Sequence, residues 1–135
     1  MIGLQRGFSL LTAIFLLVVV AAIGTFMVTI GTTQQQTSLL SILSSRALYA
    51  ADSGMEWAIA MVLNADACFG SPATFTLTGG ATDGYAVTCT CSAGTYTEGP
   101  QTYNVFTLAA TATQGNIGSP DYVQRSVRAS VTTAP

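Results

Sequence analysis

The stretch FSLLTAIFLLVVVAAIGTFMVTI, residues 8–30, decides the fold of this chain. It contains no charged side chain, and the nearest charges are Arg6 before it and Arg46 after it. As an α-helix it would be roughly 35 Å long, because each residue adds about 1.5 Å. The hydrocarbon core of a bilayer is about 30 Å thick. The sequence therefore predicts a membrane-spanning helix over residues 8–30.

The flanks of this helix indicate its orientation and its fate. Arg6 is the only cation beside it, so the positive-inside rule places the short N-terminus in the cytoplasm and the rest of the chain outside. The apolar regions of secretory signal peptides are shorter, about 7–15 residues, which favours a helix that stays in the protein. The small residues at 21–24 leave a signal peptide cut near Gly24 as an alternative.

The composition is that of an exported protein with one small domain besides the helix. Half of the 135 residues are hydrophobic, only 7% are charged, and there is no Lys or His. The net charge of −2 provides no basic patch, so nucleic-acid binding has no electrostatic support. Three cysteines follow the apolar stretch, which suits an oxidising compartment such as a periplasm.

The start of the helix carries a recognisable signal, QRGFSLL, at residues 5–11. It resembles the class III signal of type IV prepilins, in which a short leader ends in Gly and is followed by Phe and an unbroken apolar helix. The resemblance implies that residues 1–7 are a leader peptide, that a prepilin peptidase cuts between Gly7 and Phe8, and that Phe8 is then N-methylated. The hydrophobic helix would remain. The alternative is a plain signal anchor with a chance Gly-Phe pair.

One position departs from the family pattern. Typical pilins carry Glu at the fifth mature position, where this chain has Thr12. In the family that carboxylate neutralises the amino group of a neighbouring subunit inside the apolar filament core. The resemblance therefore implies a subunit with no neighbour ahead of it, at a filament tip or in an initiating complex. The alternative is that Thr12 only bonds to its own helix backbone.

The helix continues beyond the membrane to residue 64 without a Pro. Spacings of three and four place one set of residues on a single face, expected to pack on another element; the set is Leu40, Leu43, Ala47, Ala50, Gly54, Ala58 and Met61. The stretch RALYAADSGMEWA, residues 46–58, resembles minor pilins, above all the MshP proteins of mannose-sensitive haemagglutinin pilus systems. YAVTCTCSAGTYTEG, residues 85–99, resembles them more loosely.

Residues 65–135 have a different sequence pattern, in which runs of alternating apolar and polar residues are separated by turn-forming residues. Four strands are expected, at 73–78, 85–91, 102–113 and 122–132. Alternation assigns to their inward faces Phe75, Leu77, Tyr85, Val87, Phe106, Leu108, Val127, Ala129 and Val131. Arg125 shares the last of these faces, so we expect it at the sheet margin or paired with a carboxylate. The predicted fold is α+β, pilin-like: a long N-terminal helix packed on a small antiparallel sheet of about four strands.

The cysteines allow two pairings. If Thr78 pairs with Tyr85 around the predicted hairpin, the register directs Cys68 toward about position 95, nearer Cys91 than Cys89. The sequence therefore favours a disulfide between Cys68 and Cys91, with Cys68–Cys89 as the alternative. A metal site is not expected, because there is no His and no second pair of cysteines.

No combination of residues indicates catalysis. There is no His to serve as a base, no G-x-S-x-G setting for a Ser nucleophile, and no calcium-loop spacing among the acids. We therefore expect a protein that is not an enzyme and needs no cofactor.

Two classes of function follow from these features. The resemblance implies a minor subunit of a type IV pilus, held in the inner membrane with its C-terminus in the periplasm and later extracellular. Its partners would then be the prepilin peptidase, other major and minor pilins, the inner-membrane assembly platform and, before assembly, lipid. A type II secretion pseudopilin is a close variant. The alternative class is a single-span membrane protein with a small periplasmic β domain that binds some partner.

Overall fold

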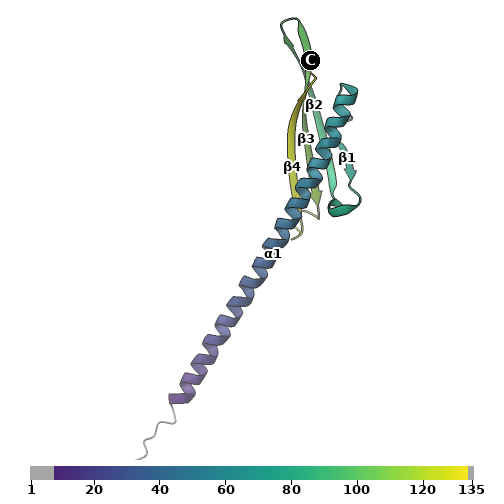
Figure 1. Cartoon of the computed structure of the whole chain (residues 1–135). Coiled ribbons are helices and arrows are strands. Elements are labelled where there is room, and N and C mark those ends of the chain that lie inside the picture. Colours follow the sequence, from purple (N-terminus) through teal and green to yellow (C-terminus); the bar gives the residue numbers. More distant parts are fainter. Residues whose placement is uncertain (1–7, 134–135) are drawn as a thin grey trace, which may run out of the picture. The chain divides into compact units, whose positions relative to one another are not determined.

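The computed structural model describes residues 8–133, which form one long helix followed by four strands (Figure 1). Helix α1 runs from Phe8 to Ala65, and the strands are β1 (Ala73–Thr76), β2 (Ala86–Glu98), β3 (Gln101–Gln114) and β4 (Val123–Thr132). Each strand pairs antiparallel with the next, so the sheet order is β1-β2-β3-β4. The predicted α+β fold is confirmed. The chain divides into two compact units, Met1–Leu39 and Leu40–Pro135, which are described separately.

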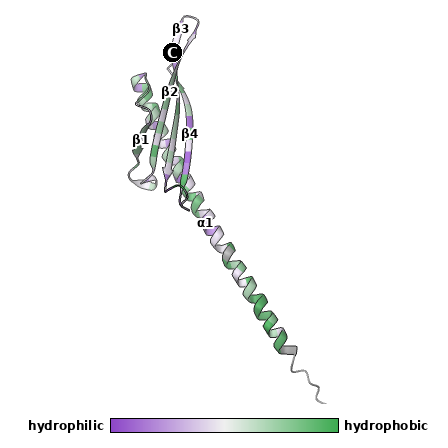
Figure 2. Cartoon of the chain, turned by 180° about the vertical axis from the view of Figure 1, so that it is seen from behind, coloured by the Kyte–Doolittle hydropathy of each residue, from purple (hydrophilic) through white to green (hydrophobic). Residues whose placement is uncertain are grey.

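The described part of the first unit is the apolar half of α1. No Pro interrupts the chain before Pro72, so every turn of the helix can form its backbone hydrogen bonds. Thr25 and Thr37 donate their hydroxyls to the carbonyls of Ala22 and Thr33, at 2.8 and 2.9 Å, which satisfies polar groups inside an apolar helix. Figure 2 shows this half as the most hydrophobic part of the chain.

The second unit packs the other half of α1 against the sheet (Figure 1). The helix residues that are buried are mostly small, which lets the helix backbone come close to the strands; they are Ala47, Ala50, Ala51, Gly54, Met55, Ala58 and Val62. The sheet contributes Val87, Cys89, Phe106, Leu108, Ala110, Ala112 and Val123 to the same core, and Tyr85, which directly precedes β2, also belongs to it. A Cβ atom at Gly54 would lie only 2.4 Å from Val87 Cγ1, so only Gly fits there without a shift.

The predicted contact face of the helix is right in its centre and wrong at its ends. Leu40 and Met61 were expected to pack, yet each exposes 42% of its surface. Leu40 lies three residues before Leu43, whose carbonyl accepts a hydrogen bond from the Tyr85 hydroxyl. Near the other end, Val62 occupies the sheet-facing side instead of Met61. The sheet also covers a wider sector of the helix than one i, i+3, i+4 stripe, so Ala51 and Met55 are buried as well.

The inward faces of the strands are confirmed. Tyr85, Val87, Phe106 and Leu108 are buried, and a second group packs against them while remaining partly exposed; that group includes Phe75, Leu77, Val127, Ala129 and Val131.

The first hairpin forms one residue out of the predicted register. Leu77, rather than Thr78, meets Tyr85: the Leu77 amide donates to the Tyr85 carbonyl at 2.9 Å, and the Gly84 amide donates to the Leu77 carbonyl at 3.0 Å. Strand β1 ends earlier than predicted, at Thr76. The turn between contains the short 3-10 helix η1 (Gly80–Thr82), and Gly84 has φ +79°, a conformation that favours glycine.

The second hairpin is longer than predicted, because β2 does not end at Cys91 but continues to Glu98. Cross-strand pairs beyond the core support the extension: Tyr96 stacks on Tyr103 with ring centroids 6.4 Å apart, and Thr95 donates to the Asn104 side chain at 3.1 Å. Gly99 and Pro100 then close a two-residue turn between Glu98 and Gln101, with Gly99 at φ +59°.

Candidate assembly site

The resemblance implies a processing site between Gly7 and Phe8. Gly7 lies outside the described residues, and Phe8 is the first residue of the helix. Thr12 lies in the second turn, and its side chain is exposed. The structure thus places Phe8 and Thr12 at the beginning of one continuous helix, while the cysteine site lies in the second unit.

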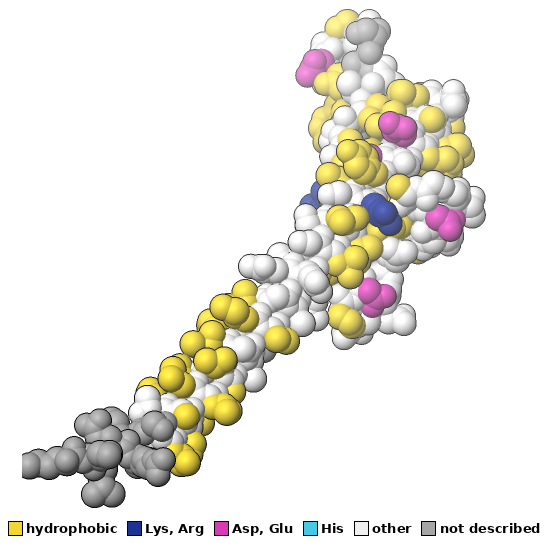
Figure 3. All heavy atoms as spheres, turned by 60° about the horizontal axis from the view of Figure 1, so that its bottom comes forward, with side chains coloured by type: hydrophobic (Ala, Val, Ile, Leu, Met, Phe, Trp, Pro, Cys, Tyr) yellow, Lys and Arg dark blue, Asp and Glu magenta, His cyan; other side chains and the backbone are white. Residues whose placement is uncertain are grey.

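The apolar half of α1 has no protein covering it in the described chain. Helix α1 is the one helix among the described residues that is long and apolar enough to cross a membrane, and none of its most apolar stretch is buried. Phe15 and Leu17, for example, expose 68% and 72% of their surfaces. Figure 3 shows hydrophobic side chains along this part of the helix with no acidic or basic side chain among them. Such an exposed apolar helix indicates membrane anchoring or secretion.

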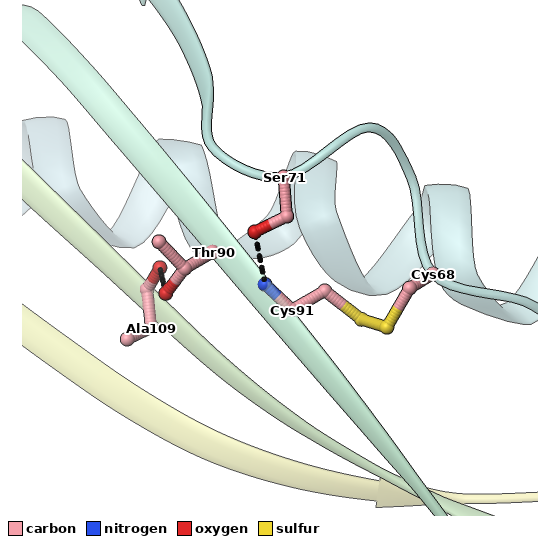
Figure 4. Close-up of a disulfide and its surroundings, with 5 residues drawn as sticks. All are labelled: Cys68, Ser71, Thr90, Cys91 and Ala109. Atoms are coloured by element: carbon pink, nitrogen blue, oxygen red, sulfur yellow. Dashed lines mark hydrogen bonds between the residues drawn. A yellow bond between two sulfur atoms is a disulfide. The ribbon is translucent and has the colours of Figure 1, made fainter.

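A disulfide joins the segment after α1 to the sheet. Cys68 and Cys91 are bonded, with their Cα atoms 5.6 Å apart and a sequence separation of 23 residues (Figure 4). This is the pair that the predicted register favoured. Close by, the Cys91 amide donates to the Ser71 hydroxyl oxygen at 3.2 Å, which ties the same segment to β2 a second time. A disulfide forms and persists in an oxidising compartment.

The third cysteine lies between helix and sheet. Cys89 is a free, fully buried thiol whose Sγ donates to the Gly54 carbonyl at 3.3 Å. Burial raises the pKa of the Cys89 thiol, because the thiolate would lose its hydration there. A buried thiol with a raised pKa is a poor nucleophile, so its place in this structure is that of a small core residue.

Two polar contacts that alternation did not reveal attach the helix to the sheet near residue 44. The Tyr85 hydroxyl donates to the Leu43 carbonyl at 3.1 Å, and Arg125 Nε donates to the Ser44 hydroxyl at 2.8 Å. Burial raises the pKa of Tyr85, an effect that the nearby Arg46 charge partly offsets. Of the two expectations for Arg125, the position at the sheet margin is confirmed, because β4 is an edge strand and Arg125 is exposed. Its partner is Ser44 and not a carboxylate. The one sign of this contact in the sequence was that Arg125, a charged residue, shares the apolar face of β4.

The end of the β2–β3 hairpin is polar and exposed. A shallow depression of about 390 Å³ lies beside it, lined by Glu98, Tyr103, Val105, Ser130, Val131 and Thr132. Tyr103 has a raised pKa because its hydroxyl bonds to the Glu98 carboxylate. Within residues 8–133, no group of three or more His, Cys, Asp or Glu side chains is placed to hold a metal ion.

No protein-family model matches this sequence, and neither a curated protein nor a solved structure matches it significantly. The geometry itself defines the class. A long N-terminal helix with an exposed apolar first half, whose second half packs on a four-stranded antiparallel sheet with a disulfide, is a pilin-like architecture.

Proposed function

We propose that this protein is a minor subunit of a type IV pilus of the mannose-sensitive haemagglutinin type. The observation that carries the proposal is the uncovered apolar half of α1, joined to a small disulfide-bonded sheet domain. In the inner membrane, lipid covers that half. In a filament, the helices of neighbouring subunits replace the lipid, so the same surface serves both states.

The signal at residues 5–11 supports this function over other membrane-anchored classes. A prepilin peptidase cleaves after Gly7 and methylates the new amino group of Phe8, and the subunit then passes through the inner-membrane assembly platform into a filament of major and minor pilins. The helix begins at Phe8, so the cleaved chain keeps the whole apolar surface. The role is structural and adhesive, without catalysis or a cofactor.

A pseudopilin of a type II secretion system would have the same N-terminal helix and sheet domain. We favour a pilus subunit over a pseudopilin because residues 46–58 resemble minor pilins. A single-span membrane protein with a periplasmic β domain also explains the exposed apolar half of α1, because lipid alone would cover it. In that case the N-terminus is not processed after Gly7.

Mass spectrometry of the mature N-terminus tests the proposal. A chain that starts at N-methylated Phe8, recovered both from the inner membrane and from sheared filaments, is the expected result. A retained Met1, or a cut near Gly24, refutes filament assembly and leaves the single-span protein. Recovery of a methylated chain from a secretion system but never from surface filaments identifies the pseudopilin.

A further inference from the structure

The free thiol of Cys89 lies on the same face of β2 as one half of the disulfide. Cys89 and Cys91 are two residues apart, and side chains two apart on a strand point to the same side. Their surroundings differ, because Cys89 is fully buried beneath α1, whereas Cys91 is only half-buried and is bonded to Cys68. One strand face thus holds a thiol and a disulfide, with the helix packed over the thiol.

The unfolded chain cannot distinguish the two cysteines of β2 as partners for Cys68. Pairing with Cys91 closes a loop with a sequence separation of 23, and pairing with Cys89 closes a loop shorter by two residues. The entropy lost on closing a flexible loop changes only with the logarithm of its length. The two pairings should therefore form at about equal frequency before folding, and a chain without a means of correction would often keep the wrong one.

Only one of the two pairings is compatible with the packed helix. The Gly54 carbonyl accepts a hydrogen bond from Cys89 Sγ at 3.3 Å, and a Cβ atom on Gly54 would lie 3.3 Å from the same sulfur. That Cβ position also lies 2.4 Å from Val87 Cγ1 and 3.5 Å from Ala110 Cβ. A second sulfur bonded to Cys89 has no room in this contact, so a chain paired through Cys89 cannot pack α1 in the same way.

We propose that Cys89 is an internal exchange thiol, which lets the chain correct its own disulfide until the packing of α1 stops the exchange. In a chain paired as Cys68–Cys89, the Cys91 thiolate attacks the sulfur of Cys68. The Cys68–Cys91 bond forms, the Cys68–Cys89 bond breaks, and Cys89 leaves as a thiolate. Cys89 then takes up a proton from water, which replaces the proton that Cys91 released. The step leaves the number of disulfides unchanged, so it needs neither an oxidant nor a reductant.

The third isomer, Cys89–Cys91, leads to the same product. The Cys68 thiolate attacks the sulfur of Cys91, and Cys89 again leaves as a thiolate. Cys89 is therefore the leaving thiol in the last step from either wrong pair.

Packing of α1 makes this last step irreversible in the folded chain. It buries the Cys89 thiol against Gly54, where the thiol cannot reach the disulfide. Burial also raises the pKa of Cys89, so less of the attacking thiolate is present. All of these residues belong to the second unit, Leu40–Pro135, so the exchange is the same in a filament subunit and in a single-span protein.

Refolding of the full-length chain in detergent, without added thiol, tests the exchange. The chain is reduced in denaturant, freed of reductant and oxidised there to form wrong pairs, and the monomer is returned to native conditions without oxygen. Samples are quenched and alkylated in acidic denaturant, and tandem mass spectrometry locates the labelled cysteine. The label should move to Cys89 alone, at a rate that does not depend on protein concentration. A label that stays divided among the three cysteines would overturn the proposal.

Blocking the free thiol supplies the control for this experiment. Chains alkylated before they return to native conditions should keep their initial mixture of disulfides, because no thiolate remains to attack. If the blocked chains convert as fast as the unblocked ones, exchange with an internal thiol is refuted.

Gly54→Val tests the part that the helix plays. The branched side chain should keep α1 from packing over Cys89, so the label should remain divided about equally between Cys89 and Cys91. Gly31→Val is the matched control, since nothing lies within 4 Å of its Cβ position, and it should end with the label on Cys89 alone. If Gly54→Val also ends with the label on Cys89 alone, helix packing does not select the disulfide and the proposal is wrong.

Discussion

The thiol of Cys89 on β2 donates a hydrogen bond to the carbonyl of Gly54 on α1, with sulfur and oxygen 3.3 Å apart. At this point the helix has no side chain, and the strand fills the space with Val87 and Cys89. Helix α1 and the sheet come too close at Gly54 for a larger side chain. This close approach explains why Gly54 occurs within a helix, where glycine is usually unfavourable.

Gly54→Ala should therefore destabilise the sheet domain. The added methyl would lie 2.4 Å from Val87 Cγ1 and 3.3 Å from the Cys89 sulfur, and overpacking of this kind costs about 1–3 kcal/mol. Thermal unfolding of the full chain in detergent measures the loss. Gly31→Ala is the control, because nothing lies within 4 Å of its Cβ position; equal melting temperatures for the two variants would contradict the packing argument.

Loss of the disulfide should have a larger effect. Cys68→Ala or Cys91→Ala should lower the free energy of unfolding by about 2–5 kcal/mol, the usual cost in a small secreted domain. Cys89→Ala should cost far less, since it removes one sulfur and one weak hydrogen bond. Chemical denaturation compares the three, and thiol mapping of the native protein should find only Cys89 free. Labelling of Cys91 in the native chain would show that the other pairing forms.

Stability should fall in alkali. Burial raises the pKa values of Tyr85 and Cys89, so each group keeps its proton in the folded chain at a pH where the unfolded chain has lost it. The stabilisation is complete below their ordinary pKa values and declines as pH rises from about 8.5 for the thiol and about 10 for the phenol. Melting temperatures between pH 7 and 11 measure the decline. The double variant Tyr85→Phe, Cys89→Ala should show a flatter profile, and an unchanged slope would mean that other groups dominate.

Processing should depend on the residue before Phe8. Gly7→Leu should block cleavage, since the peptidase site implied by the resemblance admits little bulk there, and the protein should remain in the inner membrane. Gly3→Leu makes the same change at another glycine of the proposed leader and should be processed normally. Immunoblots of membrane and sheared-filament fractions distinguish the two. Normal-sized Gly7→Leu protein in filaments would refute the class III signal.

Thr12 should restrict where the subunit enters a filament. A subunit within the shaft buries a neighbour's amino group, and without a carboxylate that charge would remain unpaired in an apolar environment, which is costly. The first subunit meets no such group, so immunogold labelling should be sparse and confined to filament ends. Thr12→Glu should then spread labelling into the shaft. Even labelling of the unchanged protein along the shaft would refute this role of Thr12.

Local sequence determined the helix and most of the strands. The apolar stretch at 8–30 and the absence of Pro predict α1 almost to its observed end at Ala65, because helix formation depends on neighbouring residues. Alternation likewise identified the buried sides of Val87 and Phe106, since side chains on a strand point to opposite faces in turn.

Contacts between distant residues were decided by the tertiary structure. Cys89 and Cys91 lie on the same face of β2, so alternation cannot choose between them. The hairpin register favoured Cys91, and the path of the segment after α1 brings Cys68 to it. The partner of Arg125 is Ser44, 81 residues away, and no local pattern links the two. The burial of Met55, which lies outside the predicted stripe, depends on how far the sheet reaches around the helix. Periodicity fixes which residues share a side of an element, and only packing fixes which side is covered and by what.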